Sequence, residues 1–323
     1  MDVAVLLLIW RRPSHVKKVI NSLRIVSPKK IYISSDGPIK DNLKNKELVE
    51  ATREIVLKEI NWDCEKILNF SHENKGCRIG VSEGIDWFFS YEEEGIILED
   101  DCVPNEDFFY FCQNLLKKYR NNDNIWAICG NGYQDNKSKN SYFFSRYLDV
   151  WGWATWRRCW NSYDKDIKSW KQNKYSSKLK NVFENTRELK YWNKIFDDLY
   201  YKGIPDTWDY QFQYQIFINS GMTCMPYINS VQNIGFGEGA THTTHILITP
   251  NNSINNVGKI KFPLIHPDKI IRSRRCDFKL QNIFYSGYPL ISFNGIKVIL
   301  KKIFFKLGKS LYFKKYLNFI KTK

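Results

Sequence analysis

The sequence predicts an α/β protein whose core is an open, mostly parallel sheet flanked by helices. Short apolar runs alternate along the first part of the chain with longer amphipathic stretches, which is the order expected of strands covered by helices. Several runs are apolar throughout, as strands buried on both faces of a parallel sheet are. With 323 residues, of which 43% are hydrophobic, the chain is long enough to bury a full core.

The length of each run and the spacing of its apolar positions assign the elements. The expected strands are Val3 to Ile9, Ile31 to Ser34, Lys66 to Phe70, Gly95 to Leu98 and Ile125 to Cys129. The expected helices are Ser14 to Val26, Leu43 to Ile60, Val81 to Tyr91 and Glu106 to Tyr119, with two more near Leu179 to Tyr201. By composition the chain divides into residues 1–130, residues 131–250, which include a stretch rich in Trp, Tyr and Lys, and a basic extension, residues 251–323.

The first expected strand and the cysteines indicate in which compartment of the cell the protein resides. The run Val3 to Ile9 is too short to span a membrane, and no basic segment precedes it as in a signal peptide. Eight cysteines form no CxxC pair, which argues against a zinc ribbon or a thioredoxin-like motif. We therefore expect a reducing, cytoplasmic setting.

The formal net charge of +15 calls for an anionic partner, and lipid, nucleic acid and a phosphorylated substrate all meet that need. No acidic residue follows Asp277, whereas lysine recurs to the end of the chain. In a helix from Ile296 to Lys309, most apolar side chains would share one face and most lysines the other. This pattern favours a helix lying on an anionic membrane, with packing on its own domain as the alternative.

Acidic residues follow two of the expected strands directly. Asp36 follows the second strand, and Glu99, Asp100 and Asp101 end or follow the fourth. Because the carboxyl ends of parallel strands meet at one edge of a sheet, both acidic sites should open onto one cleft. The triplet is either a solvated surface loop or, because so much like charge at a buried strand end calls for a cation, a site for Mn²⁺ or Mg²⁺ bound together with a diphosphate.

Two residues at this edge of the sheet, Asp36 and Arg12, could each have a structural or a ligand-binding role. Asp36 precedes Gly37 and Pro38, so it either starts a turn or accepts hydrogen bonds from the base or ribose of a nucleotide. Arg12, just past the first strand, either supplies positive charge near phosphates or is a surface residue beside a helix start.

Asp209 is flanked by the rings of Trp208 and Tyr210, which would exclude water and raise the proton affinity of its carboxylate. A base that takes a proton from an attacking hydroxyl needs such a carboxylate. The alternative is that Asp209 caps a helix running through Tyr214 and Phe217.

Residues 235–245 read GFGEGATHTTH, which predicts a glycine-rich loop close to a ligand. Gly237 and Gly239 would let backbone amides approach phosphate or sugar oxygens, and Thr241 and His242 would add side-chain contacts that close over the ligand. A zinc site formed by His242 and His245 is disfavoured, because no third ligand is evident.

Taken together, these segments resemble the GT-A-type nucleotide-sugar transferases, and in particular the alpha-mannoside beta-1,2-N-acetylglucosaminyltransferase I family and its bacterial saccharide-assembly relatives. The resemblance covers roughly residues 1 to 245. It is carried by Arg12-Pro13, Ser34-Ser35-Asp36-Gly37, the run Gly95 to Asp101, Asp107 to Phe111, Trp208-Asp209, and Phe236-Gly237 through Thr241-His242. A family histidine expected near Ser82 is missing, which leaves the identity of the nucleotide base open.

The resemblance implies roles for these residues. Asp101 would bind the metal, Asp100 the ribose, Glu99 the donor sugar and Asp36 the uracil, while Asp209 would be the catalytic base. Residues 1–130 would then bind the nucleotide sugar, and residues 131–250 the acceptor. Trp151, Trp153 and Trp156, in a block similar to one in the bacterial relatives, would line the acceptor site, unless they form an aromatic core segment.

The implied activity is metal-dependent, inverting transfer of a hexose-type sugar, with N-acetylglucosamine as the candidate, from a UDP-sugar. The acceptor would be a saccharide or a lipid-linked saccharide in bacterial surface polysaccharide or lipopolysaccharide assembly, at the cytoplasmic face of the membrane. A basic nucleic-acid-binding protein is the alternative from another class, but the strand-end acids would repel a polyanion. A sugar nucleotidyltransferase is the enzyme alternative, although its glycine-rich phosphate-binding signature near the first strand is missing.

Overall fold

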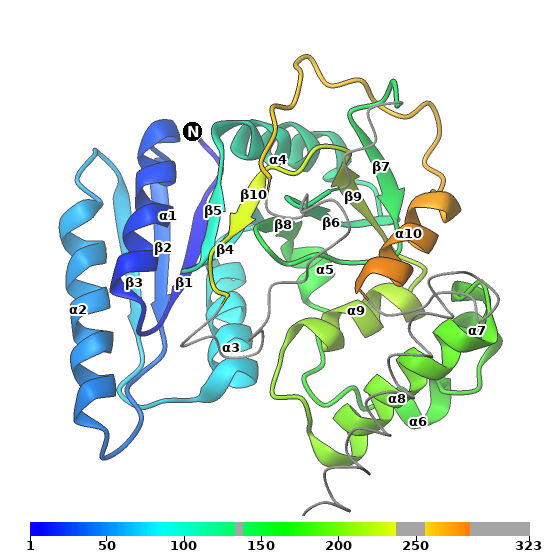
Figure 1. Cartoon of the computed structure of the whole chain (residues 1–323), viewed down its shortest axis with the longest axis horizontal. Coiled ribbons are helices and arrows are strands. Elements are labelled where there is room, and N and C mark those ends of the chain that lie inside the picture. Colours follow the sequence, from blue (N-terminus) through cyan, green and yellow to red (C-terminus); the bar gives the residue numbers. More distant parts are fainter. Residues whose placement is uncertain (133–137, 237–255, 285–323) are drawn as a thin grey trace, which may run out of the picture. The chain divides into compact units, whose positions relative to one another are not determined.

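The computed structural model describes residues 1–132, 138–236 and 256–284 (Figure 1). The chain divides into two compact units, Met1–Asp277 and Phe278–Lys323. Of the second unit the structure describes only the end of helix α10 (Arg274–Phe284), so the fold and the site below belong to the first. Both predicted halves, residues 1–130 and 131–250, fall within the range of the first unit, and their donor and acceptor roles remain predictions.

The first unit is built on an eight-stranded sheet with the order β3-β2-β1-β4-β8-β6-β9-β7. Its strands are β1 (Val5–Ile9), β2 (Lys30–Ser35), β3 (Glu65–Phe70), β4 (Glu94–Glu99), β6 (Ile125–Cys129), β7 (Tyr142–Ser145), β8 (Trp153–Trp156) and β9 (Met222–Pro226). Strands β3, β2, β1 and β4 pair in parallel, and so do β6 and β9. Strands β8 and β7 pair with their neighbours in antiparallel fashion. The expected mostly parallel sheet is confirmed.

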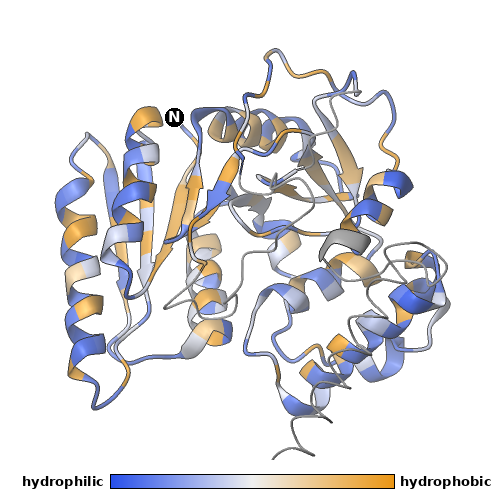
Figure 2. Cartoon of the chain, viewed as in Figure 1, coloured by the Kyte–Doolittle hydropathy of each residue, from blue (hydrophilic) through white to orange (hydrophobic). Residues whose placement is uncertain are grey.

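The described part of the first unit also contains helices, some of which pack on this sheet. They are α1 (Pro13–Val26), α2 (Leu43–Glu59), α3 (Gly76–Tyr91), α4 (Glu106–Tyr119), α5 (Arg157–Trp160), α6 (Trp170–Asn173), α7 (Ser177–Val182), α8 (Thr186–Lys202) and α9 (Asp209–Ile218). Helix α1 packs against α2 and α4, and α3 packs against β1 and β2. Every residue of β1 is buried, so both of its faces are covered. Figure 2 accordingly shows the central strands as largely hydrophobic and the helices as mixed.

Local sequence explains where the helices begin. Pro13 occupies the first turn of α1, where its missing N–H costs nothing. Asn42, Asn105 and Asn185 cap α2, α4 and α8 through their side chains. The start of α3 was predicted too late, at Val81, because Gly76 and Gly80 interrupt the apolar pattern. In the structure these glycines lie against the carboxylates of Asp206 and Asp36, where a Cβ would be only 3.0–3.1 Å away.

A two-stranded sheet brings Gly235 and Phe236, the first two residues of the predicted glycine-rich loop, to the acidic edge. Strand β5 (Cys102–Pro104), directly after the acidic triplet, pairs in antiparallel fashion with β10 (Val231–Asn233). The pair continues as the Ile234 N–H donates to the Asp101 carbonyl at 2.9 Å. The sequence predicted neither strand, since each has only three residues.

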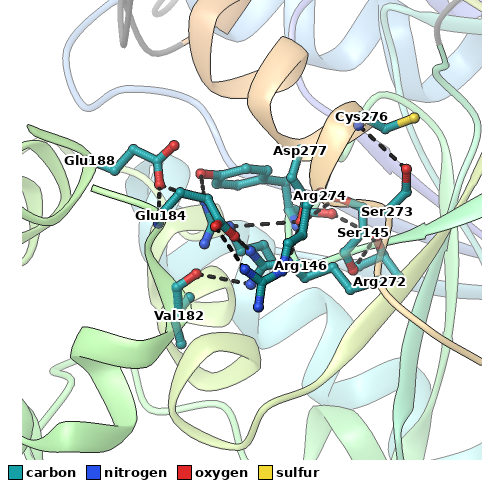
Figure 3. A network of polar contacts seen from close by, with 12 residues as sticks. Ser145, Arg146, Val182, Glu184, Glu188, Arg272, Ser273, Arg274, Cys276 and Asp277 are labelled. Atoms are coloured by element: carbon teal, nitrogen blue, oxygen red, sulfur yellow. Dashed lines mark hydrogen bonds and ion pairs between the residues drawn. The ribbon is translucent and has the colours of Figure 1, made fainter. Parts of the chain in front are cut away.

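A buried ion network fixes the chain next to α8 and α9 (Figure 3). Arg146 Nη2 lies 2.7 Å from Glu188 Oε2, and Arg146 Nε lies 3.8 Å from Asp277 Oδ2, with all three side chains almost fully buried. Asp277 also accepts a 2.6 Å hydrogen bond from Ser145 Oγ and faces Arg272 Nε at 3.0 Å. The network therefore joins β7, α8 and the last residues of the first unit.

Two further findings concern the whole described chain. No helix within the described residues is long and apolar enough to cross a membrane. The eight cysteines, all of which lie in the described ranges, form no disulfide bond with one another. The predicted basic helix from Ile296 to Lys309 lies outside the described residues.

Candidate functional site

A cavity of about 660 Å³ opens at the carboxyl ends of β1, β2 and β4. At this point the order of the strands reverses, because β2 follows β1 on one side while β4 pairs with β1 on the other. Ligands of open α/β sheets bind in the crevice at such a reversal. The topology of the sheet therefore favours a ligand in this cavity.

Most residues that the sequence singled out line this one cavity. They come from the loops after three strands, from the segment before β8 and from the start of α9: Arg12, Asp36, Glu99, Asp100, Asp101, Trp151, Trp208 and Asp209. Gly237, Gly239, Thr241 and His242, with their predicted contacts to a donor, lie outside the described residues. The fold thus brings together carboxylates that are far apart in the sequence.

Arg12 neutralises two members of the acidic triplet. Its Nη1 lies 2.6 Å from Asp101 Oδ2 and 3.2 Å from Asp100 Oδ1. The side chains of Arg12, Asp100 and Asp101 are only 18%, 9% and 14% exposed. The second oxygen of Asp100 accepts a 3.1 Å hydrogen bond from the backbone N–H of Trp10. Arg12 is therefore part of the cavity wall, and the interpretation of it as a surface residue is wrong.

Burial changes the protonation of the triplet. It raises the pKa of Glu99 to about 8, and repulsion from the carboxylates of Asp101, Asp100 and Asp209 adds to this effect. Burial also raises the pKa of Asp100 to about 6, although Arg12 lowers it in part. The raised pKa favours the protonated form of Glu99, and a protonated carboxyl can donate a hydrogen bond to a ligand oxygen.

Asp36 lines the cavity, but its carboxylate already accepts hydrogen bonds from other groups of the protein. The oxygens accept hydrogen bonds from the backbone N–H groups of Gly37 (2.8 Å), Lys75 (2.9 Å) and Gly76 (3.2 Å) and from Asn74 Nδ2 (2.9 Å). A carboxylate has about four such acceptor positions. The turn-forming interpretation of Asp36 thus describes this arrangement better than a contact to a nucleotide base does, because the carboxylate already fastens β2 to the start of α3.

Asp209 is the first residue of α9 and does not cap it. The N-cap is Trp208, and no side chain makes a capping hydrogen bond there. Instead, Thr207 Oγ1 donates a hydrogen bond to Asp209 Oδ1. Repulsion from Asp209 contributes to the raised pKa values of Glu99 and Asp149, so Asp209 lies near each of them. Asp209 thus lines the cavity that holds the triplet.

The three tryptophans of the predicted acceptor block separate in the structure. Trp151 lines the cavity and meets the ring of Phe236 edge to face, with the centroids 5.5 Å apart. Trp153 and Trp156 are buried in β8, at 0% and 2% exposure, and do not line the cavity. Trp153 stacks on Trp208 at 5.4 Å and so supports the cavity wall from behind. For these two residues the core interpretation is the correct one.

Among the residues in or next to the cavity that the sequence reasoning did not single out, three are notable. Trp10 lines the cavity, and its indole N–H donates to the Gly37 carbonyl at 2.9 Å. Thr207 holds Asp209, as described above. Asp149 accepts hydrogen bonds from Asn131 Nδ2 and the Trp151 N–H, both at 3.0 Å, and burial raises its pKa to about 6. The only signal for Trp10 in the sequence is its place directly after a strand, and Asp149 gives none.

Helix α9 is tied to the segment that carries Asp149 and Trp151. Gln213 Nε2 donates to the Arg146 carbonyl at 2.9 Å, and Gln213 Oε1 accepts from the Leu148 N–H at 2.7 Å. Arg146 is itself held by the buried ion network of Figure 3. The base candidate at the start of α9 and the aromatic residue before β8 are therefore positioned by the same contacts.

The charges of the side chains that line the cavity indicate whether a metal ion could bind there. Six acidic side chains line the cavity within the described residues, from Asp36, Glu99, Asp100, Asp101, Asp206 and Asp209, against one guanidinium, that of Arg12. No group of three or more His, Cys, Asp and Glu side chains in the described part of the chain is arranged to hold a metal by itself. A cation such as Mg²⁺ needs only one or two carboxylates when phosphates supply further ligands. The lining therefore fits a divalent cation that enters with a diphosphate.

No family model matches the sequence, and no curated protein matches it either. Solved structures do match. An apo UDP-glucose pyrophosphorylase aligns at 8% identity over 72% of this chain and 93% of its own, with a TM-score of 0.38. The mannosyltransferase PcManGT from Pyrobaculum calidifontis, in complex with GDP-Man and Mn²⁺, aligns at 9% identity over 67% and 74%, with a TM-score of 0.37.

A third match is 4-diphosphocytidyl-2C-methyl-D-erythritol synthase from Anaerococcus prevotii, at 12% identity over 50% of this chain and 76% of its own, with a TM-score of 0.31. TM-scores this low carry no argument about a reaction. The chemistry of this protein is therefore argued from its own cavity.

Proposed function

We propose that this protein is an inverting glycosyltransferase that moves a sugar from a nucleotide-diphosphate donor to a hydroxyl group of a saccharide or lipid-linked saccharide. The observation that carries the proposal is that Asp209 and the triplet Glu99, Asp100 and Asp101 line one cavity at the switch point of the sheet. The motif resemblance to the N-acetylglucosaminyltransferase I family supports the same assignment and makes UDP-N-acetylglucosamine the candidate donor.

The triplet and Arg12 bind the donor in this proposal. Asp101 holds Mn²⁺ or Mg²⁺, which when bound neutralises the charge that builds on the departing diphosphate. Arg12 adds positive charge at the phosphates. Asp100 accepts from the ribose, and Glu99 contacts the donor sugar. Without a cation, the carboxylates that line the cavity would repel the donor.

Asp209 is the base. It takes the proton of the acceptor hydroxyl as that oxygen attacks the anomeric carbon. The new carbon–oxygen bond forms while the bond from that carbon to the diphosphate oxygen breaks, and its electron pair leaves with the nucleoside diphosphate. One displacement of this kind inverts the anomeric centre. Trp151, which lines the same cavity, offers a ring against which an acceptor sugar can pack.

The two alternative functions, a sugar nucleotidyltransferase and a nucleic-acid-binding protein, would require different site features. A sugar nucleotidyltransferase joins a sugar phosphate to a nucleoside triphosphate and releases pyrophosphate, so no carboxylate is needed to take a proton from a sugar hydroxyl. A nucleic-acid-binding protein needs a cationic surface, whereas the described cavity lining is anionic. We propose the setting of surface polysaccharide assembly at the cytoplasmic face of a membrane from the basic C-terminal sequence alone.

Two substitutions test the reaction. Asp101→Ala should abolish the Mn²⁺-stimulated binding of a nucleotide sugar in calorimetry. Asp209→Asn should leave donor binding nearly intact and lower transfer by at least about a hundredfold, as removal of a general base does. Asp166→Asn, an exposed residue away from the cavity, is the matched control. Full transfer by Asp209→Asn would place the base elsewhere, and release of pyrophosphate from a nucleoside triphosphate would favour the nucleotidyltransferase.

A further inference from the structure

The backbone of Arg12 is held at the edge of the sheet by hydrogen bonds to the first turn of α1. Arg12 is the N-cap residue of α1, and its carbonyl accepts hydrogen bonds from the N–H groups of His15 (3.1 Å) and Val16 (3.0 Å). The guanidinium reaches from there to the carboxylates that follow β4. It is the only cationic group among the described residues that line the cavity.

Every carboxylate oxygen of Asp100 and Asp101 already has a donor from the protein. Arg12 Nη1 contacts one oxygen of each, at 3.2 Å and 2.6 Å. The other oxygen of Asp100 accepts from the Trp10 N–H at 3.1 Å, and that of Asp101 lies 3.5 Å from the thiol of Cys102. A cation that binds Asp101 must therefore compete with a guanidinium that is already in contact with it.

The shorter of the two ion pairs is the one to Asp101, the proposed metal ligand. A guanidinium next to a carboxylate lowers the affinity of that carboxylate for a second cation, because the two positive charges repel each other. Arginine also pairs well with phosphate oxygens, to which it can donate two parallel hydrogen bonds. A diphosphate in the cavity would thus offer Arg12 an alternative partner.

We infer that Arg12 is an internal competitor of the divalent cation, an inference that rests on the proposed donor site. Without a nucleotide, its guanidinium occupies Asp101 and Asp100 and keeps the affinity for a free cation low. A diphosphate draws the guanidinium to its own oxygens and releases Asp101, so the cation and the nucleotide bind cooperatively. By linkage, the cation must raise the affinity for the nucleotide by the same factor.

The test measures Mn²⁺ binding without any nucleotide, from the loss of the electron paramagnetic resonance signal of free Mn²⁺. Arg12→Met should bind Mn²⁺ about tenfold or more tightly than the native protein, within the usual range of coupling between sites. Arg11→Met is the matched control, because the Arg11 guanidinium lies 4.3 Å over the Trp10 ring and does not line the cavity. Its affinity for Mn²⁺ should equal that of the native protein.

A second titration adds UDP, with the chelation of Mn²⁺ by UDP alone subtracted. UDP should raise the Mn²⁺ affinity of the native protein and raise that of Arg12→Met much less. If circular dichroism shows that Arg12→Met does not fold, Arg12→Lys replaces it. A lysine keeps the charge but lacks the planar fork that contacts two carboxylates, so its Mn²⁺ affinity should lie above the native value.

Equal Mn²⁺ affinities of the native protein and Arg12→Met, whether both tight or both weak, would overturn the inference. So would equal affinities of the native protein and Arg12→Lys in the case where only the latter folds. The readout is separate from transfer. A protein that transfers sugar while these affinities are equal contradicts the competition alone, whereas a protein that shows the competition without transfer contradicts the proposed reaction.

Discussion

The backbone of Gly235 lies directly against the carboxylate of Asp101. A Cβ at position 235 would be 2.0 Å from Asp101 Oδ2, closer than any side chain can approach. The contact exists because β10 pairs with β5 and the next residue, Ile234, donates its N–H to the Asp101 carbonyl. Glycine is thus required here for the close approach of two segments, a reason the sequence alone did not supply.

We predict that Gly235→Ala displaces the Asp101 carboxylate and weakens cation-dependent donor binding. A displacement of about 1 Å at a reacting centre can cost about a hundredfold in rate, and a similar loss of transfer is expected here. Calorimetry with a nucleotide sugar and Mn²⁺, together with a transfer assay, measures both effects. Gln232→Ala, at an exposed position of β10, should change neither. Native behaviour of Gly235→Ala would mean that the Asp101 position is not critical.

Trp151→Ala should weaken binding of the acceptor and leave the affinity for the donor unchanged. The ring lines the cavity next to Phe236, and burial of an aromatic ring against a sugar contributes on the order of 1 kcal/mol or more. We expect the KM for the acceptor to rise about fivefold or more, while the dissociation constant of the donor, measured by calorimetry, stays unchanged. An equal loss for both substrates would assign Trp151 to the donor side.

The sequence predicted the acidic edge well because local patterns determine it. Apolar runs that end in Asp36 or in Glu99, Asp100 and Asp101 identify strand ends, and parallel strands bring those ends to one edge. The use of the Asp36 carboxylate could not be predicted, since three of its donors belong to residues 74–76 and depend on how α3 docks.

The aromatic block shows the same limit. The run Trp153 to Trp156 has no alternation that would reveal a strand, and it inserts as β8 between β4 and β6 against the direction of both. That placement buries Trp153 and Trp156, whereas Trp151, two residues earlier, stays at the cavity. The composition shows that the block is aromatic. It cannot distinguish residues of the protein core from residues that contact a ligand, because aromatic side chains serve both purposes.

Asp149 should make the stability of the protein depend on pH. Its pKa is raised by burial from an ordinary value of 3.8 to about 6. The folded state therefore binds this proton more tightly than the unfolded state, so the free energy of unfolding falls as pH rises through this window. In Asp149→Asn the amide oxygen can still accept from Asn131 and Trp151, and no charge develops.

We therefore expect the melting temperature of Asp149→Asn to rise relative to that of the native protein as the pH increases from about 4 to about 7. Scanning calorimetry over this range measures the difference. Asp166→Asn, at an exposed position, supplies the control curve. Parallel curves for Asp149→Asn and the native protein would show that the Asp149 carboxylate is not destabilised by burial.

The basic C-terminal sequence should bind anionic lipid. A chain that ends after Ser292 lacks the predicted lysine-rich helical face and should be released from vesicles that contain phosphatidylglycerol. Each lysine near such a surface contributes about 1 kcal/mol, so raised salt should also release the full chain. Sedimentation with vesicles measures the bound fraction, and vesicles of phosphatidylcholine alone are the control. Unchanged sedimentation of the shortened chain would make the segment a packing element.

Arg146→Met should destabilise the fold and leave the chemistry of folded molecules intact. The substitution leaves Glu188 and Asp277, whose side chains are 0% exposed, without their shared cation. Removing one partner of a buried ion pair typically costs about 3–5 kcal/mol, because the remaining charge stays buried. Urea denaturation measures this loss, and Lys190→Ala, on the exposed side of α8, should stay within about 0.5 kcal/mol of the native protein.

The hydrogen bond from Gln213 ends on the backbone carbonyl of residue 146, so it can survive the loss of the arginine side chain. The start of α9 with Asp209 should then keep its place. We therefore expect the KM for the donor to stay near the native value at temperatures well below the new transition. A changed KM with unchanged stability would show instead that the network acts on the cavity and not on the fold.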